Sequence, residues 1–116
     1  MTKSEIIANL LASKESYKKA VDSTLQARLN LTKAQDLLNT KTNTIYTTRD
    51  IKELGSNAEI RSANIAKETA GENDLVTSSN LAFETAKAEE LKARLEFDTM
   101  RYIVRLMEAP AFAENE

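Results

Sequence analysis

Residues 49–61 read RDIKELGSNAEIR, and this stretch decides where the chain turns. Leu54 ends a short helical turn, and Gly55 after it is the residue type that most often closes a helix in the left-handed conformation. Ser56 precedes Glu59 by three residues, which is the spacing of a capping box that opens a new helix. The stretch therefore predicts a bend near the middle of the chain, with a helix on either side.

The segment before the bend carries a heptad pattern. Thr2 and Glu5 have the spacing of a capping box, and two series of residues then repeat every seven positions. One series consists mostly of large residues and the other has alanine at three consecutive positions, which is typical of a helix that packs closely along an equally long partner. The two series are Leu10, Tyr17, Thr24, Leu31, Leu38, Ile45 and Ile6, Ser13, Ala20, Ala27, Ala34, Lys41. They predict a helix over about residues 4–46.

The end of that helix is rich in threonine, since residues 39–48 read NTKTNTIYTT. Threonine loses rotamer freedom in helices and is common in strands, so a short strand is an alternative here. We favour a fraying helix end, because the sequence offers no second strand-like segment to pair with it.

The second half of the chain predicts two further helices, over about residues 57–70 and 74–108. The stretch ETAGEND around Gly71 indicates a stop and a restart, with Asn73 or Asp74 as the cap of the last helix. Proline after Ala109 ends that helix, and residues 111–116 form an acidic tail that we expect to be flexible. The predicted fold is all-α: one helical domain over residues 1–110, an elongated helical hairpin resembling a coiled coil, whose second arm is kinked.

The last helix has apolar residues on two nearly opposite faces. One stripe is Leu81, Ala88, Leu91, Leu95, Tyr102 and Leu106, and the other is Ala86, Ala93, Phe97, Met100, Val104 and Met107. A single neighbouring helix cannot cover both stripes, so either the 57–70 helix folds back or a second copy of the chain supplies the cover. Because the 57–70 segment offers mainly alanines as apolar residues, with Ile60 and Ile65, it is too poor in large apolar residues to cover a stripe. We therefore favour a homodimer or higher oligomer, with an interface formed by Leu95, Phe97, Met100, Val104 and Met107.

Composition removes most enzyme designs. The 116 residues include no Cys, His or Trp, so catalytic triads, imidazole or thiolate metal sites and disulfides are excluded. We expect no catalysis, no cofactor and no bound metal. No apolar run approaches the ~18 residues of a membrane span and no signal peptide is visible, so we expect a cytoplasmic protein that does not bind membranes.

Charge suggests two kinds of partner. Residues 1–49 carry eight basic and four acidic side chains, and residues 50–116 carry eight and fourteen. The arginines of the last helix and the Lys14 to Lys19 cluster could contact a phosphate backbone, although acidic residues are interspersed and aromatics are scarce. The bend could instead display its polar residues to a protein. The candidate partner-binding residues are Lys52, Asn57, Arg61, Arg94, Arg101 and Arg105.

The segment Lys52 to Ile65, KELGSNAEIRSANI, resembles small helical proteins of tailed phages and prophages. In those proteins a KELG turn is followed by Asn and, four residues later, by Arg. The resemblance implies no catalytic residues. It implies a protein encoded in an early phage region, near genes for DNA replication and recombination, and located in the host cytoplasm. A second resemblance is to small secreted helical hairpins with a Trp-x-Gly turn, but the chain has no Trp, so this reading ranks third.

Our leading functional hypothesis is a non-enzymatic, phage-type protein that assembles with itself and binds a host or phage protein. The alternative is an accessory nucleic-acid-binding protein of phage replication or recombination.

Overall fold

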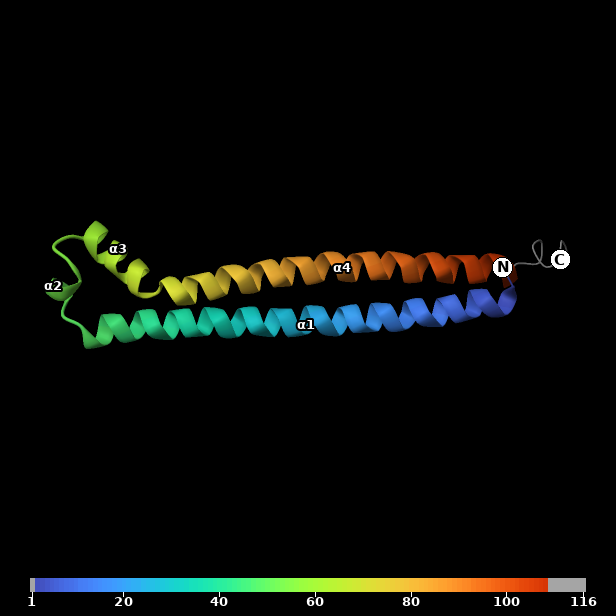
Figure 1. Ribbon diagram of the computed structural model, residues 1–116, viewed down its shortest axis with the longest axis horizontal. Coiled ribbons are helices and arrows are strands. Elements are labelled where there is room, and N and C mark those ends of the chain that lie inside the picture. Colours follow the sequence, from blue (N-terminus) through green and yellow to red (C-terminus); the bar gives the residue numbers. More distant parts are fainter. Residues whose placement is uncertain (1, 109–116) are drawn as a thin grey trace. The chain divides into compact units, whose positions relative to one another are not determined.

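A computed structural model describes residues 2–108, and all of its regular structure is helical (Figure 1). Helix α1 spans Lys3–Thr48, α2 spans Ile51–Leu54, α3 spans Ala58–Glu68 and α4 spans Ala70–Glu108. The all-α helical hairpin is therefore confirmed. The threonine-rich end of α1 is helix and not strand, and it runs two residues further than predicted. The proposed stop at Ala109 and Pro110 and the acidic tail lie outside the described residues.

The threonines of α1 enter the helix because their hydroxyls bond to its own backbone. Thr42 Oγ1 donates to the carbonyl of Leu38 at 2.8 Å, and Thr44 and Thr48 make the same bond four residues back. This bond satisfies the hydroxyl locally and removes the need for a partner strand. Residues 2–108 contain no strand with which this threonine-rich segment could pair, so the segment stays helical.

The chain divides into two compact units. Unit 1 consists of Met1–Leu25 and Thr85–Glu116, and unit 2 consists of Gln26–Glu84. In unit 1, segments of α1 and α4 run antiparallel, and Thr24 Oγ1 lies 3.1 Å from the carbonyl oxygen of Ala86. In unit 2, the end of α1 and the start of α4 are connected through α2 and α3 (Figure 1). That the chain forms one domain stays a prediction.

The covered face of α1 follows the predicted heptads with one change. Of the twelve predicted positions, Lys41 alone is exposed, and Thr42 is covered in its place. The step from Leu38 to Thr42 is four residues where the heptad would give three, a local shift that unwinds a coiled coil slightly. The shift leaves the Lys41 ammonium outside, where it donates to Glu72 Oε1 at 2.9 Å.

The two apolar stripes of α4 have different environments. The stripe that we call the inner row is half-buried or buried: Ala86, Ala93, Phe97, Met100, Val104 and Met107. The opposite stripe, which we call the outer row, is exposed along its whole length: Leu81, Ala88, Leu91, Leu95, Tyr102 and Leu106. Helix α4 is thus covered on one of its two apolar faces.

The kink of the second arm lies at Thr69 and not at Gly71. Thr69 is 2% exposed, and its hydroxyl donates to the Ile65 carbonyl at 2.8 Å and accepts from Asn73 Nδ2 at 3.1 Å. The backbone N–H of Asn73 also bonds to the Thr69 carbonyl. Since this N–H already has a backbone partner, α4 begins at Ala70 without the predicted Asn73 or Asp74 cap. Gly71 lies in its first turn.

Candidate protein-interaction faces

The bend of unit 2 is held by side chains that the sequence offers as partner-binding candidates. Asp50 caps α2 by accepting from the N–H of Lys52, and Asn57 Oδ1 caps α3 by accepting from the N–H of Ile60 at 2.9 Å. The cap of α3 is therefore Asn57, and the predicted Ser56 capping box is wrong. Asn57 is occupied within the chain, since its side-chain oxygen stabilises the first turn of α3.

The carbonyl groups of the bend are satisfied by the next turns of α3. Gly55 has φ of 145°, and its carbonyl accepts from Arg61 Nη1 at 3.4 Å. Asn64 Nδ2 donates to the Leu54 carbonyl at 2.5 Å, and Leu54 is buried with Ile45 and Ile65. The KELG turn is thus held by side chains of α3 and by apolar contact with the end of α1. Of the three candidates at the bend, Asn57 and Arg61 bond to the backbone through their side chains, whereas the side chain of Lys52 is exposed.

Asn64 has no sequence signal of its own, because an isolated Asn inside a helical pattern resembles any solvent-facing polar residue. It is nevertheless the residue that ties α3 back to α2.

The arginines of α4 are partly neutralised by one carboxylate. Arg94 Nε lies 3.8 Å from Asp98 Oδ2, and Arg101 Nη1 lies 3.5 Å from Asp98 Oδ1. The Arg101 guanidinium also lies 5.6 Å from the centre of the Phe97 ring. Arg105 is exposed one turn further on. The three arginines do share one side of α4, but the carboxylate between two of them weakens a field that would attract phosphates.

Two ion pairs link helices in unit 2. Arg49 pairs with Glu68, and Lys41 pairs with Glu72 at 2.9 Å. The hydrogen bond from Lys41 holds the pKa of the Glu72 carboxyl below its usual value. Both pairs are partly exposed to solvent, so they orient the helix ends more than they stabilise the fold.

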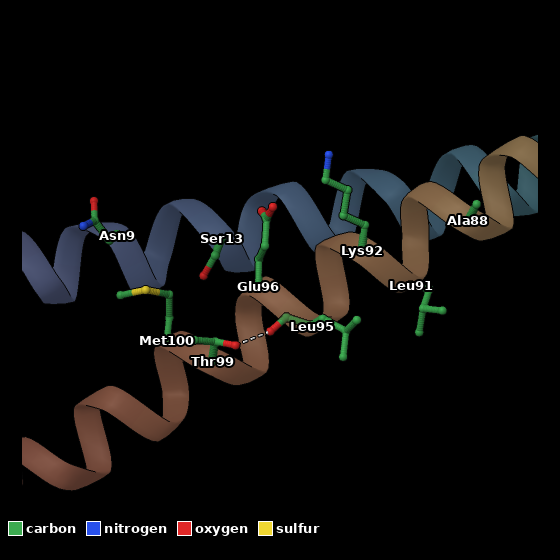
Figure 2. Close-up of a pocket in the computed structure, with 9 residues that line it drawn as sticks. All are labelled: Asn9, Ser13, Ala88, Leu91, Lys92, Leu95, Glu96, Thr99 and Met100. Carbon is green, nitrogen blue, oxygen red and sulfur yellow. Dashed lines mark hydrogen bonds between the residues drawn. The ribbon is translucent and has the colours of Figure 1, made fainter.

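The face of unit 1 beside the outer row is hollowed into an open groove of about 650 Å³ (Figure 2). Two small or polar residues of α1, Asn9 and Ser13, form one wall. The residues of α4 form the other, and Figure 2 shows Leu91 and Leu95 along its edge. The α4 lining is Ala88, Leu91, Lys92, Leu95, Glu96, Thr99 and Met100. The short side chains of Asn9 and Ser13 leave room for the groove, and the exposed Leu91 and Leu95 make its α4 edge apolar.

The five residues expected at an oligomer interface are divided by the structure. Phe97, Met100 and Val104 are half-buried, and Met107 is buried, all on the inner row. Tyr17 of α1 packs against Phe97 with ring centres 6.0 Å apart. These four therefore have cover from their own chain, and of the five Leu95 alone lies on the outer row. Their expected contact with a second copy stays a prediction.

Residues 2–108 contain no group of three or more acidic side chains placed to hold a metal ion, and none of their helices is long and apolar enough to cross a membrane. Comparison with protein-family models, with curated proteins and with solved structures gives no match.

Proposed function

We propose that the protein acts without catalysis, as a helical interaction protein that assembles with itself through the outer row of α4. The observation that carries this proposal is the exposure of that row. Its large members, Leu81, Leu91, Leu95, Tyr102 and Leu106, are 45–67% exposed. Scattered surface leucines need no explanation, whereas an apolar row on one helix face beside a groove is typical of a protein–protein contact.

The thin core supports the same proposal. The buried apolar residues within 2–108 are Ala34, Ile45, Leu54, Ile65 and Met107, and of these Met107 alone belongs to unit 1. A helix pair must bury its apolar stripes against another element to be stable. A second layer would therefore bury apolar surface that the pairing of α1 and α4 leaves exposed.

Light scattering on the purified chain tests this proposal. We expect a molar mass at least twice the 12.9 kDa of one chain, and a return to monomer mass in the double variant Leu91→Asp/Leu95→Asp. The matched control is Ser16→Asp/Ser23→Asp, which adds the same charge to exposed positions of α1. A wild type that stays at monomer mass at every concentration contradicts the proposal.

The same row would also serve a host or phage protein as partner, in line with the phage resemblance. Nucleic-acid binding is distinguished by a gel shift at low salt. Retardation that weakens with salt and is lost on replacing Arg94 and Arg105 by Glu would replace our proposal, because counterion release is the signature of phosphate contacts.

A further inference from the structure

Tyr17 and Phe97 line a smaller hollow in unit 1, apart from the groove. The hollow has a volume of about 340 Å³. The two rings are half-buried, and their centres lie 6.0 Å apart. The rest of the lining comes from α1: Lys14, Lys18, Val21 and Asp22. The hollow therefore combines an aromatic surface with two lysines.

The two lysines give the hollow unpaired positive charge. Both side chains are exposed, and neither ammonium group has an ion-pair partner within residues 2–108. Lys14 and Lys18 are four residues apart, which is a step of about 6 Å along the helix. Asp22, one turn beyond Lys18, carries the single carboxylate among the described lining residues. A matching ligand has an apolar group for the rings and two carboxylates about 6 Å apart for the lysines.

The α4 edge of the hollow favours a peptide over a nucleic acid. The Arg101 guanidinium lies over the Phe97 ring, 5.6 Å from its centre, and the Tyr17 ring meets the Phe97 ring at 56°. The rings thus offer no flat platform on which a base could stack. Because Asp98 already pairs with Arg101, Lys14 and Lys18 are the groups that remain for an anionic ligand.

The acidic tail of this chain carries the matching chemistry. Residues 109–116 lie outside the described residues and read APAFAENE. Phe112 is a large apolar residue, and Glu114 and Glu116 follow it at alternate positions. In an extended segment these three side chains share one side, and positions two apart are separated by about 7 Å. That spacing matches the step from Lys14 to Lys18.

The tail is long enough to reach the hollow from the end of α4. Glu108 follows Arg101 by seven residues and Phe97 by eleven, so the three lie on one face of α4, and Phe97 is about 17 Å from Glu108 along the helix. Four extended residues carry the backbone of Phe112 about 13 Å back along this face, and its side chain covers the remaining distance. Pro110 disfavours helical angles at the residue before it, which permits the chain to turn there.

We propose that the acidic tail docks in extended form on this hollow of its own chain, where the sequence alone suggests a flexible segment. Phe112 packs against the rings, and Glu114 lies opposite Lys14. Glu116 then lies opposite Lys18, because a tail that returns along α4 runs in the direction of α1. The tether gives the tail a millimolar effective concentration, so contacts too weak to hold a free peptide suffice. The contact needs no second copy and is independent of the proposed self-assembly.

Tryptophan fluorescence tests this contact, because the chain has no Trp of its own. In Phe112→Trp the single indole should emit at a shorter wavelength than in a synthetic peptide of residues 109–116 with the same change. If more than half of the chains are docked, acrylamide should quench the indole at least about twofold less than in the peptide. Both differences should shrink as salt is added, since the lysines and carboxylates are exposed to solvent.

Charge reversal locates the contact. Adding Lys14→Glu/Lys18→Glu to Phe112→Trp should return the emission and the quenching to the values of the free peptide. The matched control is Lys19→Glu/Lys33→Glu, which makes the same charge change at exposed positions of α1 outside the hollow. This control should keep the indole protected, and circular dichroism checks that both variants stay helical.

The same indole measured in Leu91→Asp/Leu95→Asp separates the docked tail from self-assembly. Protection that persists in this variant supports docking within one chain, whether or not the wild type is dimeric. Protection that is lost places Phe112 in the groove or on a second copy, and overturns the docking proposed here. An indole as exposed as in the peptide, or protection that survives Lys14→Glu/Lys18→Glu, also overturns it and leaves self-assembly to its own test.

Discussion

The side-chain amide of Asn64 donates to the backbone carbonyl of Leu54 across ten residues, at 2.5 Å. Leu54 is the last residue of α2, so its carbonyl has no helical donor four residues further on. Asn64 supplies that donor from the second turn of α3. The bond fixes the angle of the bend and keeps the Leu54 side chain between Ile45 and Ile65.

Replacing Asn64 by Ala should lower the free energy of unfolding by about 1–2 kcal/mol, because a carbonyl beside a buried residue loses its partner. Urea denaturation followed by circular dichroism measures the change. Asn43→Ala is the matched control, since Asn43 has an exposed side chain on α1. Equal midpoints for the two variants would show that the Asn64 bond contributes nothing.

Gly55→Ala should destabilise the chain. The residue has φ of 145°, which L side chains rarely adopt, and an added Cβ would lie 2.5 Å from Ile60 Cγ2. We expect a loss of about 1–3 kcal/mol, measured in the same denaturation experiment. A midpoint unchanged from wild type would contradict the strained conformation of the bend.

Gly71→Ala should have the opposite sign. Gly71 lies inside the first turn of α4, and an added Cβ would meet no atom within 4 Å. Alanine restricts the unfolded chain and favours helix, so the gain should be about 0.5–1 kcal/mol. Destabilisation here would mean that the chain needs a break at Gly71 after all, as its sequence first suggests.

Phe97→Ala should lower the free energy of unfolding by about 1–3 kcal/mol. The substitution removes the ring of the inner row that packs against Tyr17. Leu29→Ala is the control, since Leu29 is an exposed apolar residue of α1. Thermal unfolding at one fixed protein concentration compares the two. Similar small losses in both variants would place Phe97 outside any packed contact.

Stability should depend on the Lys41–Glu72 pair in a pH-dependent way. The pKa of Glu72 is lowered in the folded chain by the hydrogen bond from Lys41. The stabilisation of the folded chain by this pair is therefore complete above the ordinary glutamate pKa of about 4.3. It is lost as the pH falls through the lower pKa that Glu72 has in the folded chain.

The difference in unfolding midpoint between wild type and Lys41→Met should accordingly be present at neutral pH and shrink in acid. Glu72→Gln should behave in the same way. An NMR titration of the Glu72 carboxyl checks the cause directly, because its pKa should rise in Lys41→Met. A difference that grows on acidification would reverse the assigned sign.

The sequence predicts the helix pairing well because the pairing is periodic. The heptads of α1 identify the covered face from Ile6 to Leu38, and the inner and outer rows of α4 are both visible in the sequence. Which row faces α1 is not visible, because both have apolar residues at helical spacing. In the structure the inner row faces α1, where the Phe97 ring lies 6.0 Å from the Tyr17 ring.

Single hydrogen bonds account for most of what the sequence leaves open. Gly71 predicts an interruption between the last two helices, but the interruption occurs at Thr69. The Thr69 hydroxyl donates to the Ile65 carbonyl and accepts from Asn73 Nδ2. Likewise Asn57 and Arg61 read as residues for a partner, and both bond to the backbone of the bend. These side chains bond to nearby backbone groups, so they are not available for the partner contacts that the sequence suggests. The apolar periodicity of the sequence does not predict such bonds.

Tyr17 and Phe97 also decide between alignments. A seam that repeats every seven residues fits its partner again after a slide of seven, so apolar spacing alone allows several pairings of the two helices in unit 1. After such a slide Tyr17 would face Glu90 or Val104, and Thr24 would leave the carbonyl of Ala86. A chain that loses Tyr17 should therefore keep its helix content while its helices sample more than one alignment.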